Sequence, residues 1–411
     1  MRKHIPQIVI ILIFGLRSFA FSQTTNYPHP SNNPQSPMML AGDWVPEDSH
    51  DIDFFALPRV PSEHAIVNDV RYAWGRKVNQ HNYLAYFDGM FWAMWSDGPG
   101  EPREGLTAEQ HYHVTPGHDK AGQLISYATS KDGINWTEKR DLAGNPDIGF
   151  AWIARGFWIR DGKLLGLATR YNAPGYRGAG LQLHAFEMTT SGGEIKWKPL
   201  GVVLDNAMNN FPPKKIPTGE WMMSRRDSVG DVYMIVGGSK AFNSWESYPV
   251  QGSRGQELAG EEPYWFELED GNLAALFRDN NRSGYLFRAF STDNGRTWST
   301  PVKTNFPDAR SKFCALQLTD GRYVVVSNAN PEKRDPLTIA ISDDGLVFTK
   351  MGFLVGERNI DYPHLIQVGD YIYVTFDGAK QTVEVLKIKI SDLDKLKMPS
   401  KNEMTLKDEN N

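Results

Sequence analysis

Arginine side chains recur at the predicted ends of strands, where a repeat protein would bring them together. The candidate ligand-binding arginines are Arg155, Arg170, Arg225, Arg226 and Arg278. A guanidinium group is a planar fork that binds a carboxylate through two parallel hydrogen bonds. Several such groups in a chain with a formal net charge of −5 predict a ligand that carries a carboxylate, such as a uronate or a sialate. The alternative is that these arginines form structural ion pairs with acidic residues of neighbouring repeats.

A second set of residues has the chemistry to move protons or to attack a sugar. The candidate catalytic residues are His81, Gln80, Tyr362 and Glu262. Imidazole titrates near neutral pH, so His81 is a candidate general acid or base, and a structural hydrogen bond is its alternative role. Asp361 and His364 are further candidate substrate-binding residues. An ordinary glycosidase needs two carboxyl groups about 5 to 9 Å apart, and the sequence leaves their separation open.

Two loops are candidates for contact with the ligand. Residues 96–123 form a long insertion that carries three histidines, and His113 is the one that we predict to touch the substrate. Loops of this length in a compact repeat protein are usually functional. The histidine spacing is unlike that of a zinc site, so we predict neither a metal nor a cofactor. Tyr176, in the loop 172–178, has a ring that a sugar can stack on.

A repeated turn organises the elements that must position these residues. Ser291-Thr292-Asp293-Asn294-Gly295-Arg296-Thr297-Trp298 has the form of an Asp-box: the Asp carboxylate accepts backbone N–H groups, Gly takes a positive φ, and Trp is a hydrophobic plug. Shorter relatives begin at Ser130 and Ser342, and degenerate ones end at Trp197 and Trp245. Their first serines lie 48 to 61 residues apart. This period indicates an all-β protein of β-propeller type.

Hairpin signals of the Asp-Gly type occur six times, so we predict a propeller of six four-stranded antiparallel blades, with seven as the alternative. The sixth unit lacks a fourth strand, and we expect residues 51–57 to supply it while residues 60–80 form a rim segment or help to build a seventh blade. The expected organisation is a signal peptide at 1–22, an extended leader at 23–50, a single propeller domain at 51–392, and a flexible tail at 393–411. The tail is charged and shows no turn or strand signal.

Composition limits the classes of partner. The charges are interspersed and the net charge is negative, which argues against nucleic acid or an anionic membrane as partner and leaves an acidic oligo- or polysaccharide. Residues 1–22 have a basic start, a short apolar run and a small-residue cleavage pattern, which predict secretion, most simply to a bacterial periplasm. Cys314 is the only cysteine, so neither an internal disulfide nor a lipid-anchor Cys is expected. The sequence leaves the oligomeric state open.

One repeat resembles the corresponding blade of sialidases. The segment Glu262-Pro263-Tyr264-Trp265-Phe266-Glu267-Leu268-Glu269-Asp270-Gly271 is followed by Arg278 and then by the Asp-box at Ser291. The resemblance implies that Glu262 assists a nucleophilic Tyr362 and that Arg278 belongs to a carboxylate-binding triad. The family's N-terminal Arg-Ile-Pro is represented by Arg59-Val60-Pro61, and Asp69 is the candidate for its acid.

Over most of the chain the sequence is more similar to secreted Bacteroidetes propellers of glycoside hydrolase family 145 and polysaccharide lyase family 27. The segments that carry this similarity are 79–83, 94–100, 152–158 and 210–215. The resemblance implies seven blades and an exo-acting, α-L-rhamnosidase-like hydrolase on L-rhamnose that caps D-glucuronic acid in arabinogalactan-type glycans. It also implies one catalytic His near Gln80 and His81. The alternatives are a lyase on the same linkage, an exo-sialidase-like hydrolase, and a non-catalytic propeller that binds acidic glycans.

Overall fold

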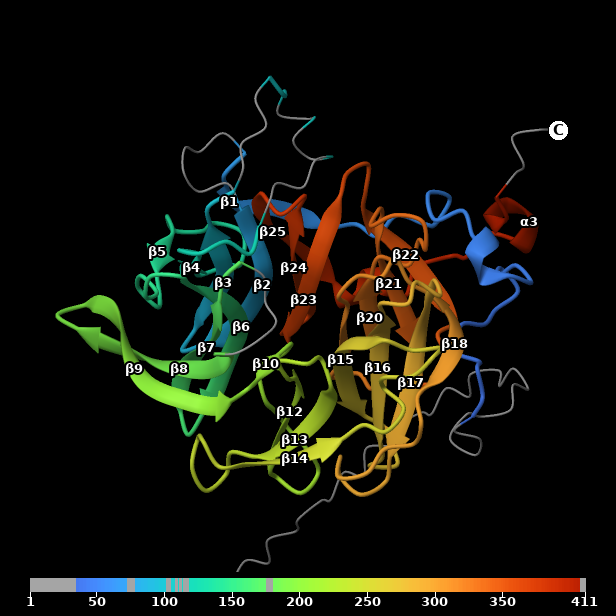
Figure 1. The fold of residues 1–411 in the computed structure, drawn as a ribbon. Helices are drawn as coiled ribbons and strands as arrows, with labels where there is room; N and C mark the ends of the chain where they lie inside the picture. The colour runs from blue at the N-terminus through green and yellow to red at the C-terminus, as the bar shows by residue number, and fades with distance from the viewer. Residues whose placement is uncertain are drawn as a thin grey trace, which may run out of the picture.

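The protein is a ring of six antiparallel sheets, as the repeat count predicts (Figure 1). The computed structural model describes residues 35–71, 78–100, 105–107, 110, 113, 118–174 and 180–406. Blades one to three consist of β2 (Val78–Phe87), β3 (Met90–Gly98), β4 (Leu124–Ser130) and β5 (Arg140–Asp141); β6 (Phe150–Arg160), β7 (Lys163–Asn172), β8 (Gln182–Ser191) and β9 (Glu194–Asp205); and β10 (Met208–Asn209), β11 (Lys214–Lys215), β12 (Trp221–Arg226), β13 (Val232–Gly237) and β14 (Trp245–Pro249).

The other three blades repeat the same meander. They consist of β15 (Gly260–Glu267), β16 (Leu273–Asp279), β17 (Tyr285–Ser291) and β18 (Val302–Pro307); β19 (Cys314–Gln317), β20 (Tyr323–Ser327), β21 (Leu337–Ser342) and β22 (Lys350–Val355); and β23 (Ile360–Val368), β24 (Tyr371–Gly378), β25 (Thr382–Lys389) and β1 (Glu63–Asp69). Blade three has five strand segments because Pro212 and Pro213 interrupt its first strand between β10 and β11, where proline cannot donate a ladder hydrogen bond.

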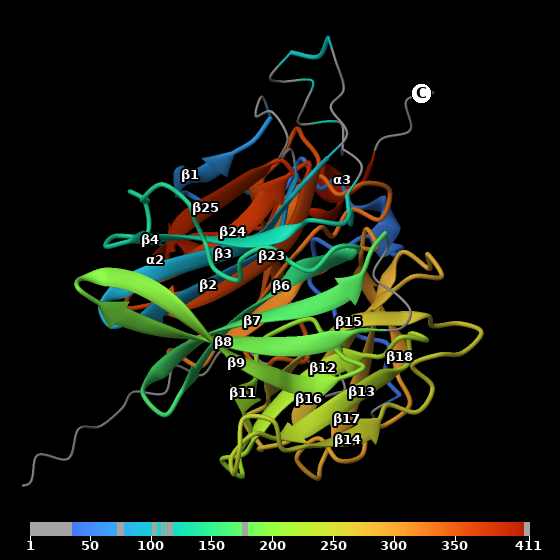
Figure 2. The ribbon, with the colours of Figure 1, turned by 60° about the vertical axis from the view of Figure 1, so that its left-hand side comes forward.

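The ring closes through an N-terminal strand, but not through the one that we predicted. β1 pairs with β25, so the first strand of the described residues completes the last blade, and both views show β1 beside β25 (Figures 1 and 2). Residues 51–57, the expected closing strand, instead begin at the end of a short 3-10 helix, η2 (Ser49–Asp51), and touch the C-terminal segment through a bridge between Ile52 and Thr405. Because residues 63–69 belong to blade six and Val78 begins blade one, the described chain builds no seventh blade.

The segment after residue 392 is packed against the ring rather than frayed as a tail. It contains the end of α2 (Ile390–Leu393) and a second short helix, α3 (Lys401–Met404). The side chains of Leu393 and Met404 are fully buried, and the carbonyl of Met404 accepts a hydrogen bond of 2.7 Å from the N–H of Asp53. The expectation of a flexible tail is therefore wrong for residues 393–406. No helix among the described residues is both long and apolar enough to span a membrane.

The Asp-boxes have the geometry that their sequence predicts. In the turn after β17, the Asp293 carboxylate accepts the backbone N–H of Thr297 at 2.8 Å, and Gly295 has φ +82°. The indole N–H of Trp298 donates to the Gly295 carbonyl at 2.9 Å, and the ring is buried. The degenerate box of blade three keeps the last contact, since Trp245 donates to the carbonyl of Phe242 at 2.8 Å. Each plug fixes the connection between two strands and fills apolar space at the edge of its blade.

Replacing Trp298 with Ala should lower the free energy of unfolding by about 3–5 kcal/mol, because the change empties a large buried volume that the surrounding strands cannot refill. The measurement is chemical denaturation followed by tryptophan fluorescence and circular dichroism. Tyr86, whose side chain is 41% exposed, is the control: Tyr86→Ala should change the stability by less than about 0.5 kcal/mol. Equal effects of the two changes would contradict the role that we assign to the plug.

Candidate active site

Four blades share an irregularity in their first strand, and it directs side chains towards the axis. The pairing of the first and second strands shifts between Gln80 and Tyr83, Ala154 and Phe157, Glu261 and Tyr264, and Asp361 and His364. Each shift leaves two residues of the first strand without a partner on the second. Bulges of this kind re-aim side chains and are common beside active sites.

The first residue of each bulge is His81, Arg155, Glu262 or Tyr362, one from each blade. Backbone φ is +57° at His81, +47° at Glu262 and +53° at Tyr362, a region that residues with a Cβ rarely adopt. In blade two the strained position falls one residue later, on Gly156, which accepts φ +93° without steric cost. Strain of this kind, held by a rigid sheet, is typical of a site that needs a fixed side-chain direction.

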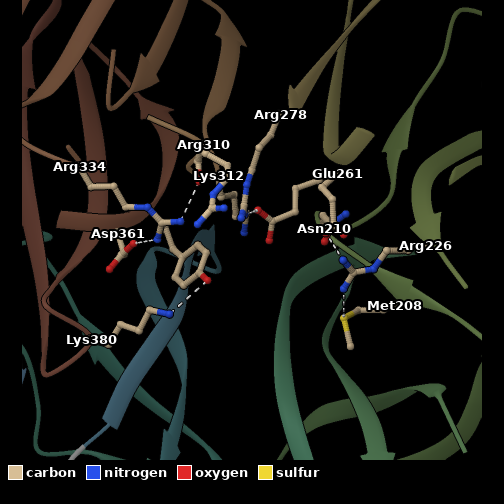
Figure 3. Close-up of polar contacts among 12 residues, drawn as sticks. Met208, Asn210, Arg226, Glu261, Arg278, Arg310, Lys312, Arg334, Asp361 and Lys380 are labelled. Carbon is tan, nitrogen blue, oxygen red and sulfur yellow. Dashed lines mark hydrogen bonds and ion pairs between the residues drawn. The ribbon is translucent and has the colours of Figure 1, made fainter. Parts of the chain in front are cut away.

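These bulges line a small polar pocket of about 180 Å³ near the axis of the ring. Its walls are formed by His81, His118, Asp119, Ile153, Arg155, Met208, Arg226, Glu261, Glu262, Arg278, Arg334, Tyr362 and Lys380. Figure 3 shows Arg226, Arg278 and Arg334 entering the same space from different blades. Lys312 is not part of the lining; it is fully buried, and its ammonium group donates to the hydroxyl of Tyr83 at 2.7 Å. Cationic side chains outnumber carboxylates in the lining, so the pocket is cationic.

Three of the pocket arginines are held by carboxylates. Arg226 pairs with Glu261, Arg334 pairs with Asp361, and the Nη1 atom of Arg278 lies 2.5 Å from a carboxylate oxygen of Glu262. Burial opposes the charged form of Glu262, but Arg278 and Lys312 outweigh it and hold the pKa of Glu262 below its usual range. The two roles that the sequence left open for the arginines are therefore not exclusive, because the same side chains form ion pairs and line the pocket.

Arg155 differs from these arginines. Its side chain is only 2% exposed, yet its Nε and Nη1 atoms are buried without a hydrogen-bond partner, and among the described residues no carboxylate pairs with it. The imidazole of His81 shares this environment: burial, followed by the charges of Arg155 and Lys312, lowers the pKa of His81 well below its usual value. His81 is therefore neutral at physiological pH and has a lone pair available as a base.

Tyr362 is a buried phenol in contact with His81 and Lys380. Its ring stacks on His81 with centroids 4.5 Å apart, and its hydroxyl lies 3.5 Å from the ammonium group of Lys380. Burial raises the pKa of Tyr362 and the charge of Lys380 acts against that rise. Lys380 is 5% exposed and also lies 3.0 Å from His118.

The remaining predicted residues lie around the pocket or away from it. Gln80 stands behind the wall and donates to Asp119 at 3.0 Å, and Asp361 acts through its pair with Arg334. His364 lies deeper, where its Nδ1 accepts the N–H of Leu84 at 3.1 Å.

Arg170 and Arg225, which we predicted to face the ligand, are outside the pocket. Arg170 pairs with Asp147 at 2.6 Å, and Arg225 donates to the carbonyl of Asn206 at 2.9 Å. Both lie at the ends of second strands, where the alternation of side chains directs them away from the axis. His113 is exposed and does not line the pocket, and Tyr176 lies outside the described residues.

Several wall residues were not predicted from the sequence, chiefly Arg334, Lys380, His118 and Asp119. Arg334 lies in the connection between β20 and β21, whereas we considered only the ends of first and second strands. That connection opens on the pocket face, so its length and its arginine were a usable signal. His118 and Asp119 belong to the long insertion of blade one, whose contact with the site was predicted through a different histidine. No cluster of His, Cys, Asp or Glu in the described ranges has the arrangement of a metal site.

Two residues that match the sialidase pattern, Arg59 and Asp69, lie outside the pocket. Arg59 forms a bridge with Phe353 of blade five and lies 3.5 Å from the centre of its ring. Asp69 ends β1 and pairs with Arg71 at 2.6 Å. Glu262, Arg278 and Tyr362, in contrast, all line the pocket. The resemblance therefore extends to one side of the site.

The fold and the axial pocket define a β-propeller with Asp-box turns, and the comparisons with known proteins agree. Residues 110–374 match the family described as BNR repeat-like domain, and the chain belongs to that family. None of the curated proteins matches the sequence.

Solved structures show the same fold at low identity. A protein of unknown function from Dyadobacter fermentans has a TM-score of 0.61 and 16% identity, over 81% of this chain and 100% of that one. A Trypanosoma rangeli sialidase in complex with 2,3-difluorosialic acid has a TM-score of 0.60 and 15% identity, over 82% of this chain and 60% of the sialidase. The NanB sialidase from Streptococcus pneumoniae has a TM-score of 0.55 and 12% identity, over 80% and 71%. The chain thus spans about 60% of the trypanosomal enzyme.

Arg155→Met and Arg278→Met should differ in their effect on stability. Removing Arg278 leaves Glu262 buried without its counter-ion, which should lower the free energy of unfolding by about 3–5 kcal/mol. Removing Arg155 deprives no carboxylate of a partner and removes a costly buried charge, so the melting temperature should stay constant or rise. Differential scanning calorimetry of both variants tests this. Equal losses would show that Arg155 is a structural residue.

The low pKa of His81 should make the protein sensitive to acid. The unfolded chain binds a proton at this residue below about pH 6.5 whereas the folded chain does not, so the stability conferred at higher pH is lost as the pH falls below that value. The His81→Gln variant lacks this proton and should lose less stability between pH 7 and pH 5, by up to about 1.4 kcal/mol for each pH unit. Parallel curves of melting temperature against pH for the two proteins would contradict the assignment.

Proposed function

We propose that this protein is an exo-acting carbohydrate enzyme of glycosidase type that acts on a glycan end with a carboxylate beside the bond to be cleaved. The observation that carries the proposal is the set of cationic side chains from several blades around a pocket of about 180 Å³, together with Tyr362, His81 and Glu262. A pocket of this volume accepts the terminal sugar of a chain more readily than a longer stretch of it. The cations stabilise a bound carboxylate and any negative charge that develops during reaction.

The pocket residues support a division of roles. Tyr362 is our candidate nucleophile: a phenol next to a carboxylate-bearing sugar avoids the repulsion that an Asp or Glu nucleophile would meet, and sialidases use Tyr in this role. Lys380, 3.5 Å from its hydroxyl, stabilises the phenolate. Glu262 is held by Arg278, so it orients that arginine and is a weak base. Neutral His81 stacks on Tyr362 and is our candidate for proton transfer.

For the substrate, we propose L-rhamnose linked to D-glucuronate at the end of an arabinogalactan-type side chain, as the sequence resemblance implies. The uronate carboxylate then binds the cations while rhamnose leaves. The same residues support elimination as an alternative, because neutralising the carboxylate acidifies the adjacent C–H bond and the neutral ring of His81 has one unprotonated nitrogen that can accept the proton. Such a substrate is extracellular, which agrees with the secretion expected from residues 1–22.

A second candidate function is the hydrolysis of sialosides. The observation that favours it is that Tyr362, Glu262 and Arg278 line one pocket, with Arg278 bound to Glu262. Arg334 adds a further cation to the same wall. In a sialoside the carboxylate and the leaving group are attached to the same carbon. The bound sugar would therefore lie closer to blades four to six, which contribute Glu262, Arg278 and Tyr362.

The two candidates are separated by incubating the full chain with gum arabic and with sialyllactose. Free rhamnose without the ultraviolet absorbance of an unsaturated uronate indicates hydrolysis, and rhamnose with that absorbance indicates elimination. Free sialic acid instead establishes the second candidate. Release of no sugar from either substrate, with retained binding of acidic glycans, would overturn the catalytic proposal in favour of a binding propeller.

Tyr362→Phe should abolish turnover on whichever substrate is cleaved, by at least about 1,000-fold in kcat, because the phenyl ring keeps its stacking on His81 but has no nucleophilic oxygen. Its melting temperature should change little, since the lost hydroxyl has only a long contact of 3.5 Å to Lys380. Tyr86→Phe, at a 41% exposed position, is the matched control and should retain full activity. Retained activity in Tyr362→Phe would exclude the nucleophile role.

A further inference from the structure

The charge of Arg155 is not compensated by the protein. Arg226, Arg278 and Arg334 each contact a carboxylate of the chain. For Arg155, no carboxylate partner occurs in the part of the chain that the structure describes, and two of its guanidinium nitrogens are buried without any hydrogen bond. Burying a cation in this state is costly, and the cost is removed when an anion binds. The side chain lines the pocket, so an anion from solvent has access to it.

The paired arginines are poorer anion sites for the same reason. A ligand carboxylate that approaches Arg226 or Arg278 must share the guanidinium with Glu261 or Glu262, whose negative charges repel it. Arg155 forms no such pair: the carboxylate of Asp119, which lines the same pocket, contacts Gln80 and His118 instead. Lys312 and Lys380 act on His81 together with Arg155, and the imidazole is itself kept neutral. The electrostatic field around Arg155 and His81 therefore favours a bound anion more strongly than the field beside the paired arginines does.

The position of Arg155 in the ring gives the bound sugar a direction. Arg155 comes from blade two, His81 from blade one and Tyr362 from blade six, which are consecutive around the ring because β1 of blade six closes onto β25 and the chain continues into β2. The His81 ring, stacked on Tyr362, thus stands between Arg155 and the phenol in blade order. The Nδ1 atom of His81 is also buried without a partner, so it too is available to a ligand.

We propose that Arg155 is the carboxylate-binding residue of the pocket, and that it holds the acid group of a uronate so that the rest of the sugar extends across His81 towards Tyr362. The inference rests on the proposed function and specifies it further, since it assigns the acid group to one residue. A guanidinium fork suits a planar carboxylate better than the compact charge of a lysine does. The paired arginines then shape the walls rather than bind the acid.

Calorimetric titration of the full chain with D-glucuronate, and with D-glucose as its neutral counterpart, tests the subsite without requiring turnover. The native protein should bind glucuronate in preference to glucose. Arg155→Met should weaken glucuronate binding by roughly 10- to 100-fold, the range expected for lost hydrogen bonds to a charged group, and Arg155→Lys should recover part of it. Arg225→Met is the matched control: this neighbouring arginine lies outside the pocket and its loss should leave binding unchanged.

Three results would overturn the proposal: equal binding of glucose and glucuronate, no glucuronate binding by the native protein, or unchanged glucuronate binding in Arg155→Met. A fourth variant, with Arg226 and Glu261 both replaced by Met, removes a paired arginine together with its carboxylate. Loss of binding in this variant, with retention in Arg155→Met, would place the acid at Arg226. Arg155-dependent binding without cleavage of any glycan would refute the proposed enzyme activity and leave the subsite standing.

Discussion

The pocket depends on charge pairing between neighbouring blades. Arg226 of blade three contacts Glu261 of blade four, and Arg334 of blade five contacts Asp361 of blade six. Arg226, Glu261 and Asp361 are buried and Arg334 is partly buried. A buried charge is stable in a fold only when an opposite charge or a set of hydrogen bonds accompanies it. The pairs therefore link the blades at the pocket end of the ring as well as forming the walls. A blade that shifted outward would separate two charges in a poorly solvated space.

The apolar parts of the fold make this pairing possible. Asp-box plugs such as Trp298 fix the connections at the blade edges, and strand β1 closes the ring, so each first strand has two packed neighbours. Rigidity of this kind lets the sheets hold positive φ at bulged residues that have a Cβ. The strain costs about 1–2 kcal/mol at each such residue. This cost is small compared with the free energy that six blades gain by burying their apolar side chains. Local distortion at the axis is thus supported by packing further out.

The blade number was predictable from sequence because the Asp-Gly type of hairpin turn, which occurs six times, is a local signal that needs no help from distant residues. The closing strand was not, since only Val67 is buried along β1 and an edge strand of this kind has no alternating apolar pattern. Lys380 was missed for a related reason. It lies in a tight turn that looks solvated in sequence, and its burial comes from Tyr362 and His118, which are distant in the chain. Long-range burial of a charge leaves no trace in local composition.

Blade two shows what the positive φ values are for. There the bulge takes its positive φ at Gly156, which relieves the strain, and the functional side chain moves to the preceding residue, Arg155. In the other bulges His81, Glu262 and Tyr362 carry both the strained backbone and the functional group. If the bulges served only to shape the strands, glycine would suffice at every one of them. Retaining a histidine, a glutamate and a tyrosine at that conformational cost indicates that the direction of the side chain, rather than the shape of the strand, is what these positions maintain.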